Sequence, residues 1–355
     1  MHKRYFAVPA LLASAALALS GCSAGTTASA DSGANDLKVV ATTTQVADFT
    51  RNVIGTASGV DLTQLIQPNQ SAHSYDPSAA DLTALGTADV LVINGVGLEE
   101  WLDDAIAASG FDGVMIDADE GITISEVGAG EDHSKDEHAE DEHAEDGDEH
   151  ADEDEHADED EHAHEGGDPH IWTDVQNAET IVQTITDGLV AADSDNAAAF
   201  EVNATAYSAQ LSALDDWIRT NVDTVPESDR LLVSNHDALG YFTAAYHIDY
   251  VGSVIPSFDD NAEPSAAEID SLVAAITATG VTAVFSEASL SPKTAETIAT
   301  EAGVTVYSGD DALYVDSLGP DGSAGDTYIN AQLHNATLML ESWGVTPSAL
   351  PADLQ

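Results

Sequence analysis

The sequence predicts an α/β protein built of two Rossmann-like lobes, each a four-stranded parallel sheet with flanking helices, joined by one long rigid helix. Three observations support this fold class. Short β-branched runs alternate with longer amphipathic runs from Leu37 onward, a pattern typical of parallel strands covered by helices. These runs form two groups of four, and a long helical tract separates the groups. With 355 residues, 43% of them hydrophobic, the chain has material for two such cores.

The first group of runs predicts an N-terminal lobe over residues 37–195. Helical stretches such as TQVADFTRNVIG and LEEWLDDAIAASG lie between its strands. Each ends in a glycine, which is common at the C-terminal end of a helix. The four β-branched runs are expected to form strands over 37–43, 60–66, 90–95 and 113–117.

The helical tract over 196–222 links the two lobes. At 1.5 Å per residue such a helix is roughly 40 Å long, enough to cross the back of both lobes, and a helix of this length resists hinging. Its apolar residues recur at spacings of three and four and so form one stripe. The stripe consists of Phe200, Ala204, Tyr207, Leu211, Leu214 and Ile218.

The second group of runs predicts a C-terminal lobe over residues 223–355. It contains the amphipathic stretch AAEIDSLVAAITATG, which again ends in glycine. Its strands are expected over 230–235, 248–253, 281–287 and 304–309.

Acidic residues dominate the charge of the chain. Asp and Glu number 65 against 8 Lys and Arg, which gives a formal net charge of −57. Such a surface repels phosphate backbones and anionic headgroups, so we expect no nucleic-acid partner and no electrostatic membrane binding. Cations remain as partners. A preference of the lineage for acidic residues explains the acidity of the body equally well.

The N-terminus carries a lipoprotein signal over residues 1–21. The basic start MHKRYF precedes the apolar run AVPALLASAALA, which is too short to span a bilayer comfortably. The closing LSGC resembles the lipobox of bacterial lipoproteins, which predicts lipidation of Cys22, a flexible tether over 22–36 and an extracytoplasmic place on the cell membrane. An ordinary secretory signal is the alternative. Because Cys22 is the only cysteine, any metal must bind His, Asp or Glu.

The segment 131–165 consists of units such as DEHA, EDEHA and DEDEHA and has no apolar periodicity. We expect this loop to be disordered without ligand. Its histidines and acids predict several weak, exchangeable zinc sites, because a flexible loop loses conformational entropy on binding. An inert solubilising loop is the alternative. Its seven histidines are His133, His138, His143, His150, His156, His162 and His164.

Five further histidines lie in the folded body. His73, His170 and His236 occur at strand or loop ends, in QPNQSAHSYDPSAAD, DPHIW and VSNHDALGYF. In open α/β lobes ligands bind beyond the carboxyl ends of the strands, so these three imidazoles can converge. His247 and His334 lie within or at the edge of helices, which favours core or surface roles for them.

Five separated motifs resemble the zinc and manganese solute-binding lipoproteins of bacterial ABC importers, from Leu37 to about Trp343. They are QPNQSAHSYDPSAAD, DPHIWTD, SNHDALGYFTAAYHI, FSEASLSPK and YVDSLGPDGSAGDTYINAQLHN. The resemblance implies two metal ligands from each lobe: His73, His170, His236 and Asp316.

The metal is expected to be zinc. Manganese members of the resembling family carry glutamate at the third ligand position, where this chain has His236. Three nitrogens and one oxygen suit Zn²⁺ as the transported ligand, with Mn²⁺ as the alternative. A ligating imidazole usually donates its second N–H to a carboxylate or carbonyl. By position, the candidates for that role are Asp76, Asp168, Asp237 and Glu287.

The resemblance implies a zinc-specific binding protein that hands Zn²⁺ to an ABC permease and its ATPase, acts as a monomer and is no enzyme. The family's His-rich insertion is regarded as gathering zinc or sensing its supply. A secreted zinc hydrolase is a competing hypothesis. That class needs an open coordination position, which Asp316 would close, and the chain has no H-E-x-x-H motif. A manganese importer protein, and a surface protein of cell adhesion with a structural metal, are two further hypotheses.

Overall fold

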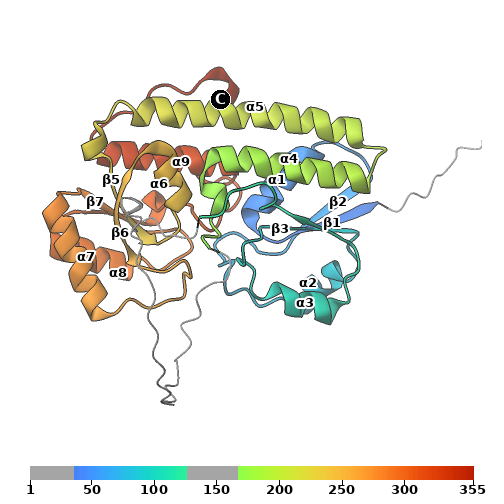
Figure 1. Ribbon diagram of the computed structural model, residues 1–355, viewed down its shortest axis with the longest axis horizontal. Helices are drawn as coiled ribbons and strands as arrows, with labels where there is room; N and C mark the ends of the chain where they lie inside the picture. The colour runs from blue at the N-terminus through green and yellow to red at the C-terminus, as the bar shows by residue number, and fades with distance from the viewer. Residues whose placement is uncertain (1–35, 126–166) are drawn as a thin grey trace, which may run out of the picture. The chain divides into compact units, whose positions relative to one another are not determined.

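The computed structural model describes residues 36–125 and 167–355, which belong to one compact unit from Asp36 to Gln355. Within this unit, two groups of parallel strands lie next to each other, and a long helix runs across both (Figure 1). The predicted α/β class with two lobes is therefore confirmed. The signal peptide, Cys22, the tether and the segment 131–165 lie outside the described residues.

The N-terminal lobe contains one four-stranded parallel sheet in the order β2-β1-β3-β4. Its central strands are buried, and Val39 of β1 lies opposite Val90 of β3. All four strands predicted for this lobe are present. The strands are β1 (Leu37–Ala41), β2 (Val60–Gln64), β3 (Val90–Ile93) and β4 (Val114–Asp117), and the helices between them are α1 (Thr44–Ile54), α2 (Ala79–Leu85) and α3 (Leu102–Ser109).

The C-terminal lobe has all four predicted strands but differs from the predicted single sheet. Hydrogen bonds join β5 to β6 and β7 to β8 in two separate parallel ladders. At both ends of β5, backbone groups form hydrogen bonds with side chains. The Trp343 indole donates to the Leu231 carbonyl at 2.9 Å, and the His236 N–H donates to the Glu287 carboxylate at 3.2 Å. The elements are β5 (Leu231–His236), α6 (Gly240–Tyr246), β6 (Asp249–Ile255), α7 (Ala266–Thr279), β7 (Ala283–Phe285), α8 (Lys293–Ala302) and β8 (Thr305–Tyr307).

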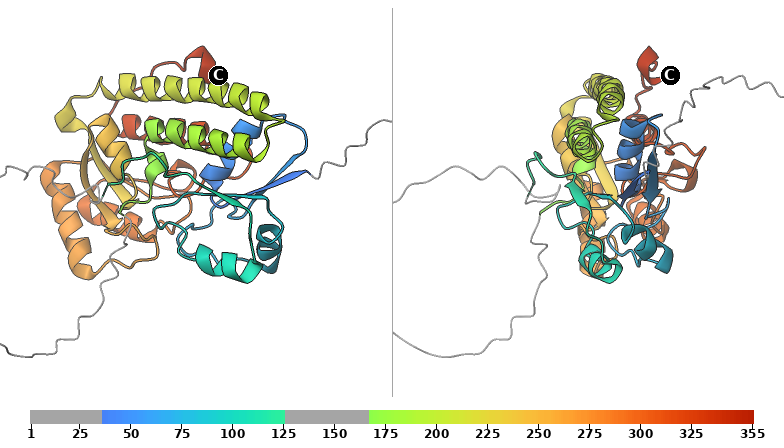
Figure 2. Two further views of the ribbon diagram at one scale, coloured as in Figure 1. Left: turned by 45° about the vertical axis from the view of Figure 1, so that its right-hand side comes forward. Right: turned by 90° about the vertical axis from the view of Figure 1, so that its right-hand side faces the viewer.

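The long helix predicted over 196–222 is α5 (Ala197–Val222). It packs on α4 (Val175–Ala192), α1 and α9 (Tyr328–Ser342), and both views in Figure 2 keep it along one edge, above α4. All residues of the predicted apolar stripe are buried, so the spacing of three and four identified the packed face correctly.

The hydrophobic core is continuous between the two lobes. The Phe49 ring of α1 lies 4.7 Å from the Tyr328 ring of α9 and 6.4 Å from the Tyr207 ring of α5, measured between centroids. Because buried aromatic side chains contribute strongly to packing, separating the lobes widely would expose this shared core. Large opening is therefore costly, and small movements of loops are favoured.

Several helices begin where the sequence supplies a capping side chain. Thr43 accepts the Val46 N–H at the start of α1, and Ser78 and Ser265 form capping boxes at the starts of α2 and α7. α7 ends at Gly280, whose φ of +79° favours glycine. None of the helices in the described ranges combines the length and the apolar composition needed to span a bilayer.

Candidate metal centre

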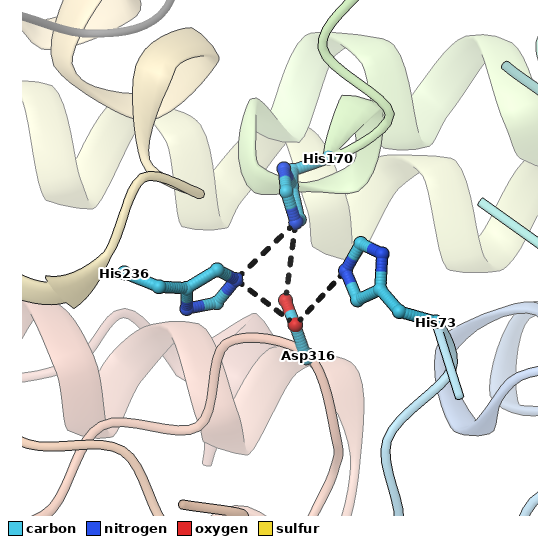
Figure 3. Close-up of side chains that lie close together, drawn as sticks. All are labelled: His73, His170, His236 and Asp316. Carbon is cyan, nitrogen blue, oxygen red and sulfur yellow. Dashed lines mark hydrogen bonds and ion pairs between the residues drawn. The ribbon is translucent and has the colours of Figure 1, made fainter. Parts of the chain in front are cut away.

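Four predicted residues, His73, His170, His236 and Asp316, meet in one buried cluster (Figure 3). His73 lies on the loop between β2 and α2, and His170 directly precedes the short 3-10 helix η2 (Ile171–Thr173) that leads into α4. His236 is the last residue of β5, and Asp316 lies on the loop before α9. Chain segments from both lobes thus deliver one side chain each to the same point.

The distances are those of a site for a single cation. Asp316 Oδ2 lies 3.4 Å from His73 Nε2 and 3.0 Å from His236 Nε2, while Asp316 Oδ1 lies 3.5 Å from His170 Nε2. The Nε2 atoms of His170 and His236 are 3.4 Å apart. One ligand atom of each residue lies within 4.8 Å of all the others. These four atoms could hold one ion after a small inward movement of the most distant ligand.

The buried polar atoms of the cluster fit a cation. In the described part of the chain, His73 Nε2 and both carboxylate oxygens of Asp316 are buried without a hydrogen-bond partner. Buried polar groups are nearly always paired, because burial without a partner costs free energy. A divalent cation between these atoms would satisfy them together.

Two carboxylates hold two of the imidazoles from behind. Asp168 Oδ1 lies 2.7 Å from His170 Nδ1, and Glu287 Oε1 lies 2.5 Å from His236 Nδ1. A carboxylate at Nδ1 accepts a hydrogen bond from that N–H, which fixes the tautomer and turns Nε2 toward the metal position. Of the four candidates for this role, Asp168 and Glu287 are in place. Asp76 is exposed.

The charges of the cluster are coupled. Burial lowers the pKa of His236, but the Asp316 and Glu287 carboxylates outweigh it and hold this pKa well above its ordinary value. For His73, burial also lowers the pKa, but the nearby Asp316 carboxylate raises it overall. Burial raises the pKa of Asp316, but the charges of His236 and His170 hold it well below its usual range.

The loop that carries Asp316 is fastened to the N-terminal lobe. The Val315 carbonyl accepts hydrogen bonds from Gln45 Nε2 at 2.8 Å and from Trp172 Nε1 at 3.0 Å. The Leu318 N–H donates to Thr44 Oγ1 at 2.9 Å. Asp316 therefore belongs to the C-terminal part of the sequence but is positioned by both lobes.

A second network supports His170 and was missed from the sequence. The Glu99 carboxylate is buried and accepts hydrogen bonds from Thr42 Oγ1 at 2.6 Å and from the Asn94 N–H at 2.8 Å. The Asn94 side chain donates to the Pro169 carbonyl at 3.0 Å, next to His170. Glu99 follows β3 in GVGLEE, where its pattern is that of a solvated helix start, so nothing local in the sequence marks it as buried.

The other described histidines lie elsewhere. His247 is exposed at the C-terminal end of α6, and His334 on α9 lies 3.0 Å from the Ala312 carbonyl through Nε2. The histidines of the segment 131–165 lie outside the described residues.

Comparison with known proteins agrees with this geometry. The family described as zinc-uptake complex component A, periplasmic, matches residues 39–342. The manganese-binding lipoprotein MntA of Halalkalibacterium halodurans is 30% identical over 320 residues, 90% of this chain and 92% of that protein. The iron ABC transporter substrate-binding lipoprotein MtsA of Streptococcus pyogenes serotype M1 is 27% identical over 316 residues, 87% of this chain and 89% of that protein.

A solved structure shares the fold. The periplasmic zinc binding protein TroA from Treponema pallidum superposes with a TM-score of 0.69 at 24% identity, covering 86% of this chain and 98% of that one. The matched family consists of substrate-binding transport proteins, so the prediction that the chain is no enzyme is confirmed. The chain belongs to the family of zinc-uptake complex component A, the metal-binding substrate-binding proteins of ABC importers.

Proposed function

We propose that the chain is an extracytoplasmic zinc carrier that binds one Zn²⁺ tightly through His73, His170, His236 and Asp316. The observation that carries this proposal is the buried cluster in which these four residues offer ligand atoms within 4.8 Å of one another. Three imidazole nitrogens and one carboxylate oxygen suit four-coordinate zinc, whereas manganese favours more oxygen ligands. Four protein ligands also leave no open position for a reacting water, which favours carriage over hydrolysis.

The relatives make manganese the main alternative. MntA is named for manganese, MtsA for iron and TroA for zinc, so the family alone does not select the ion. Competition between Zn²⁺ and Mn²⁺, followed by growth under each limitation, separates the two proposals. Zinc carriage requires that Zn²⁺ displaces Mn²⁺ and that loss of the protein impairs growth when zinc is scarce. A protein of cell adhesion with a structural metal would leave growth under either limitation unchanged.

Delivery to a permease driven by an ATPase is the role of a substrate-binding component of an ABC importer. We further propose that residues 1–21 are a cleaved signal peptide and that a lipid on Cys22, followed by the tether 22–36, anchors a monomer to the outer face of the membrane. The lipoprotein relatives support this anchor. Replacement Cys22→Ser is expected to release the protein from the membrane fraction.

Metal release is proposed to need only a small movement. Lobes over 37–195 and 223–355 share a core and are spanned by the helix 196–222, which opposes wide opening. Displacement of one ligand-bearing segment would suffice to break the four-fold coordination.

The segment 131–165 is proposed to collect zinc at low affinity. The test is calorimetric titration of the full chain and of a variant lacking residues 131–165. We expect one tight equivalent in both proteins and additional weak equivalents only in the full chain. Loss of the tight equivalent on deletion would refute the assignment of the metal centre, and retention of all weak equivalents would refute the role of the segment.

A further inference from the structure

One carboxylate beside the metal centre has no role in the arrangement described above. Asp260, on the loop after β6, is 5% exposed, and its Oδ2 has no hydrogen-bond partner among residues 36–125 and 167–355. An unpaired buried carboxylate oxygen is costly, so its presence needs a physical reason.

The other oxygen of Asp260 ties its loop to that of His73. Asp260 Oδ1 accepts hydrogen bonds from Ser71 Oγ at 3.0 Å and from Asn261 Nδ2 at 2.8 Å. Ser71 Oγ in turn accepts the His73 N–H at 3.2 Å. A second contact, from Ser74 Oγ to Asn261 Oδ1 at 3.3 Å, joins the same two loops. Asp260 is thus linked to the His73 loop through Ser71, while its Oδ2 makes no hydrogen bond within the described residues.

The charge of Asp260 interacts electrostatically with residues of the metal centre. Burial raises the pKa of Asp260, the charge of Asp316 raises it further, and His73 and His236 act in the opposite direction. The carboxylate therefore lies within electrostatic range of three residues of the centre, although it is not one of the four whose ligand atoms cluster within 4.8 Å. On the same loop, the Phe258 ring lies 6.1 Å from the His170 ring.

We propose that Asp260 is a transit ligand: its free oxygen binds the divalent cation briefly as the ion passes between solvent and the four residues of the centre. This inference rests on the proposed function, since it requires a cation in the centre. A carboxylate that replaces one bound water at a time spares the ion the loss of its whole hydration shell in one step. Such a ligand lowers the barrier to both capture and release. Because its charge also acts on the cation in the centre, its loss slows capture more than release and weakens the affinity.

The test is the replacement Asp260→Asn, which keeps an oxygen that can accept from Ser71 and removes the charge. Stopped-flow measurement of zinc capture, and of zinc release to a chelator, is expected to show capture slowed by about five-fold or more and release slowed by a smaller factor, with Kd raised by the ratio of the two. The melting temperature of the metal-free variant checks that the fold is retained.

The matched control is Asp270→Asn, on the exposed face of α7, which removes the same charge away from the centre. This control is expected to leave both rates unchanged, which excludes general electrostatic attraction as the cause. Unchanged rates in Asp260→Asn overturn the proposal, and so does faster release with a matching loss of affinity, since that is the behaviour of a simple closing contact. Absence of a tight zinc equivalent in the unmodified protein would instead refute the proposed function.

Discussion

His170 and His236 differ from His73 in how the fold holds them. The side chains of His170 and His236 are fully buried, and each has a carboxylate at Nδ1. His73 has 7% of its side chain exposed, and no carboxylate holds its Nδ1 in this way in the part of the chain that the structure describes. The first two imidazoles are therefore aligned before a cation arrives, whereas the third is positioned mainly by its loop.

This difference indicates how one site can be both tight and reversible. Fixed ligands supply affinity, because little orientation remains to be lost on binding. A ligand on a loop permits release of the metal, because its displacement breaks coordination without disturbing the shared core. His73, fastened through Ser71 to the loop of Asp260, is the member of the cluster suited to that displacement.

The largest expected effect is the loss of zinc affinity in His236→Ala, which we compare with that in His73→Ala. Removing His236 should lower zinc affinity by more than about 100-fold, because it removes a metal ligand and also leaves the buried Glu287 carboxylate with only the backbone N–H of residue 236 as its partner among the described residues. His73→Ala should cost clearly less. Chelator competition measures both, and His247→Asn, an exposed site whose left-handed backbone asparagine tolerates, is the control. An equal or larger loss for His73→Ala would remove the distinction between the imidazoles held by a carboxylate and the imidazole positioned by its loop.

The next effect is that of pH on binding. Because the carboxylates raise the pKa of His236 and of His73 above the ordinary histidine value, zinc must displace protons from these imidazoles near neutral pH. Affinity should fall as the pH falls, by about ten-fold per pH unit for each proton displaced. Calorimetry in buffers of different ionisation enthalpy counts these protons, and a count of zero at pH 7 would contradict the expectation.

The stability of the metal-free protein should change with pH in the direction opposite to zinc affinity, falling as the pH rises. A raised folded-state pKa contributes stability that is fully present below the unfolded histidine value of about 6.5 and is lost as the pH rises through the folded value. The melting temperature without metal should therefore decline as the pH rises through the raised pKa values, while the increment added by zinc grows.

A smaller loss of zinc affinity is expected when Asp168 or Glu287, the carboxylates that contact an imidazole, loses its charge. Asp168→Asn and Glu287→Gln each keep an oxygen that can accept from Nδ1 but lose the charge that orients the imidazole. We expect each to lower zinc affinity by about 10-fold, at the low end of what such partners cost. Asp76→Asn, at an exposed acid, should have no effect. Equal effects at all three positions would show that net charge, and not contact with the imidazole, is responsible.

Periodicity was sufficient for the elements, because it is a local property, and the resemblance of five motifs to a known family supplied the four cluster residues. The sequence was insufficient for strand pairing and for side-chain contacts, because these depend on segments far apart in the chain. The division of the C-terminal strands into two ladders, and the hydrogen bonds that Trp343 and Glu287 make with β5 from far along the chain, have no local signal in the sequence. Asp168 and Glu287 could not be separated from Asp76 and Asp237, because only the folded chain determines which carboxylate faces an imidazole. Glu99 and Asp260 carried no local signal at all.

The smallest expected effect concerns the attachment of the Asp316 loop to the N-terminal lobe. Trp172→Phe keeps the aromatic ring but removes the indole N–H that donates to the Val315 carbonyl. That carbonyl still accepts from Gln45, so the substitution costs one hydrogen bond and the cavity left by the smaller buried ring, together about 2–3 kcal/mol in the free energy of unfolding. Because Asp316 is the next residue, zinc affinity should fall by only a few-fold, and less than in Glu287→Gln. Denaturant unfolding and chelator competition measure the two quantities. A loss of affinity as large as that of His236→Ala would mean that the position of Asp316, more than the fixed imidazoles, limits binding.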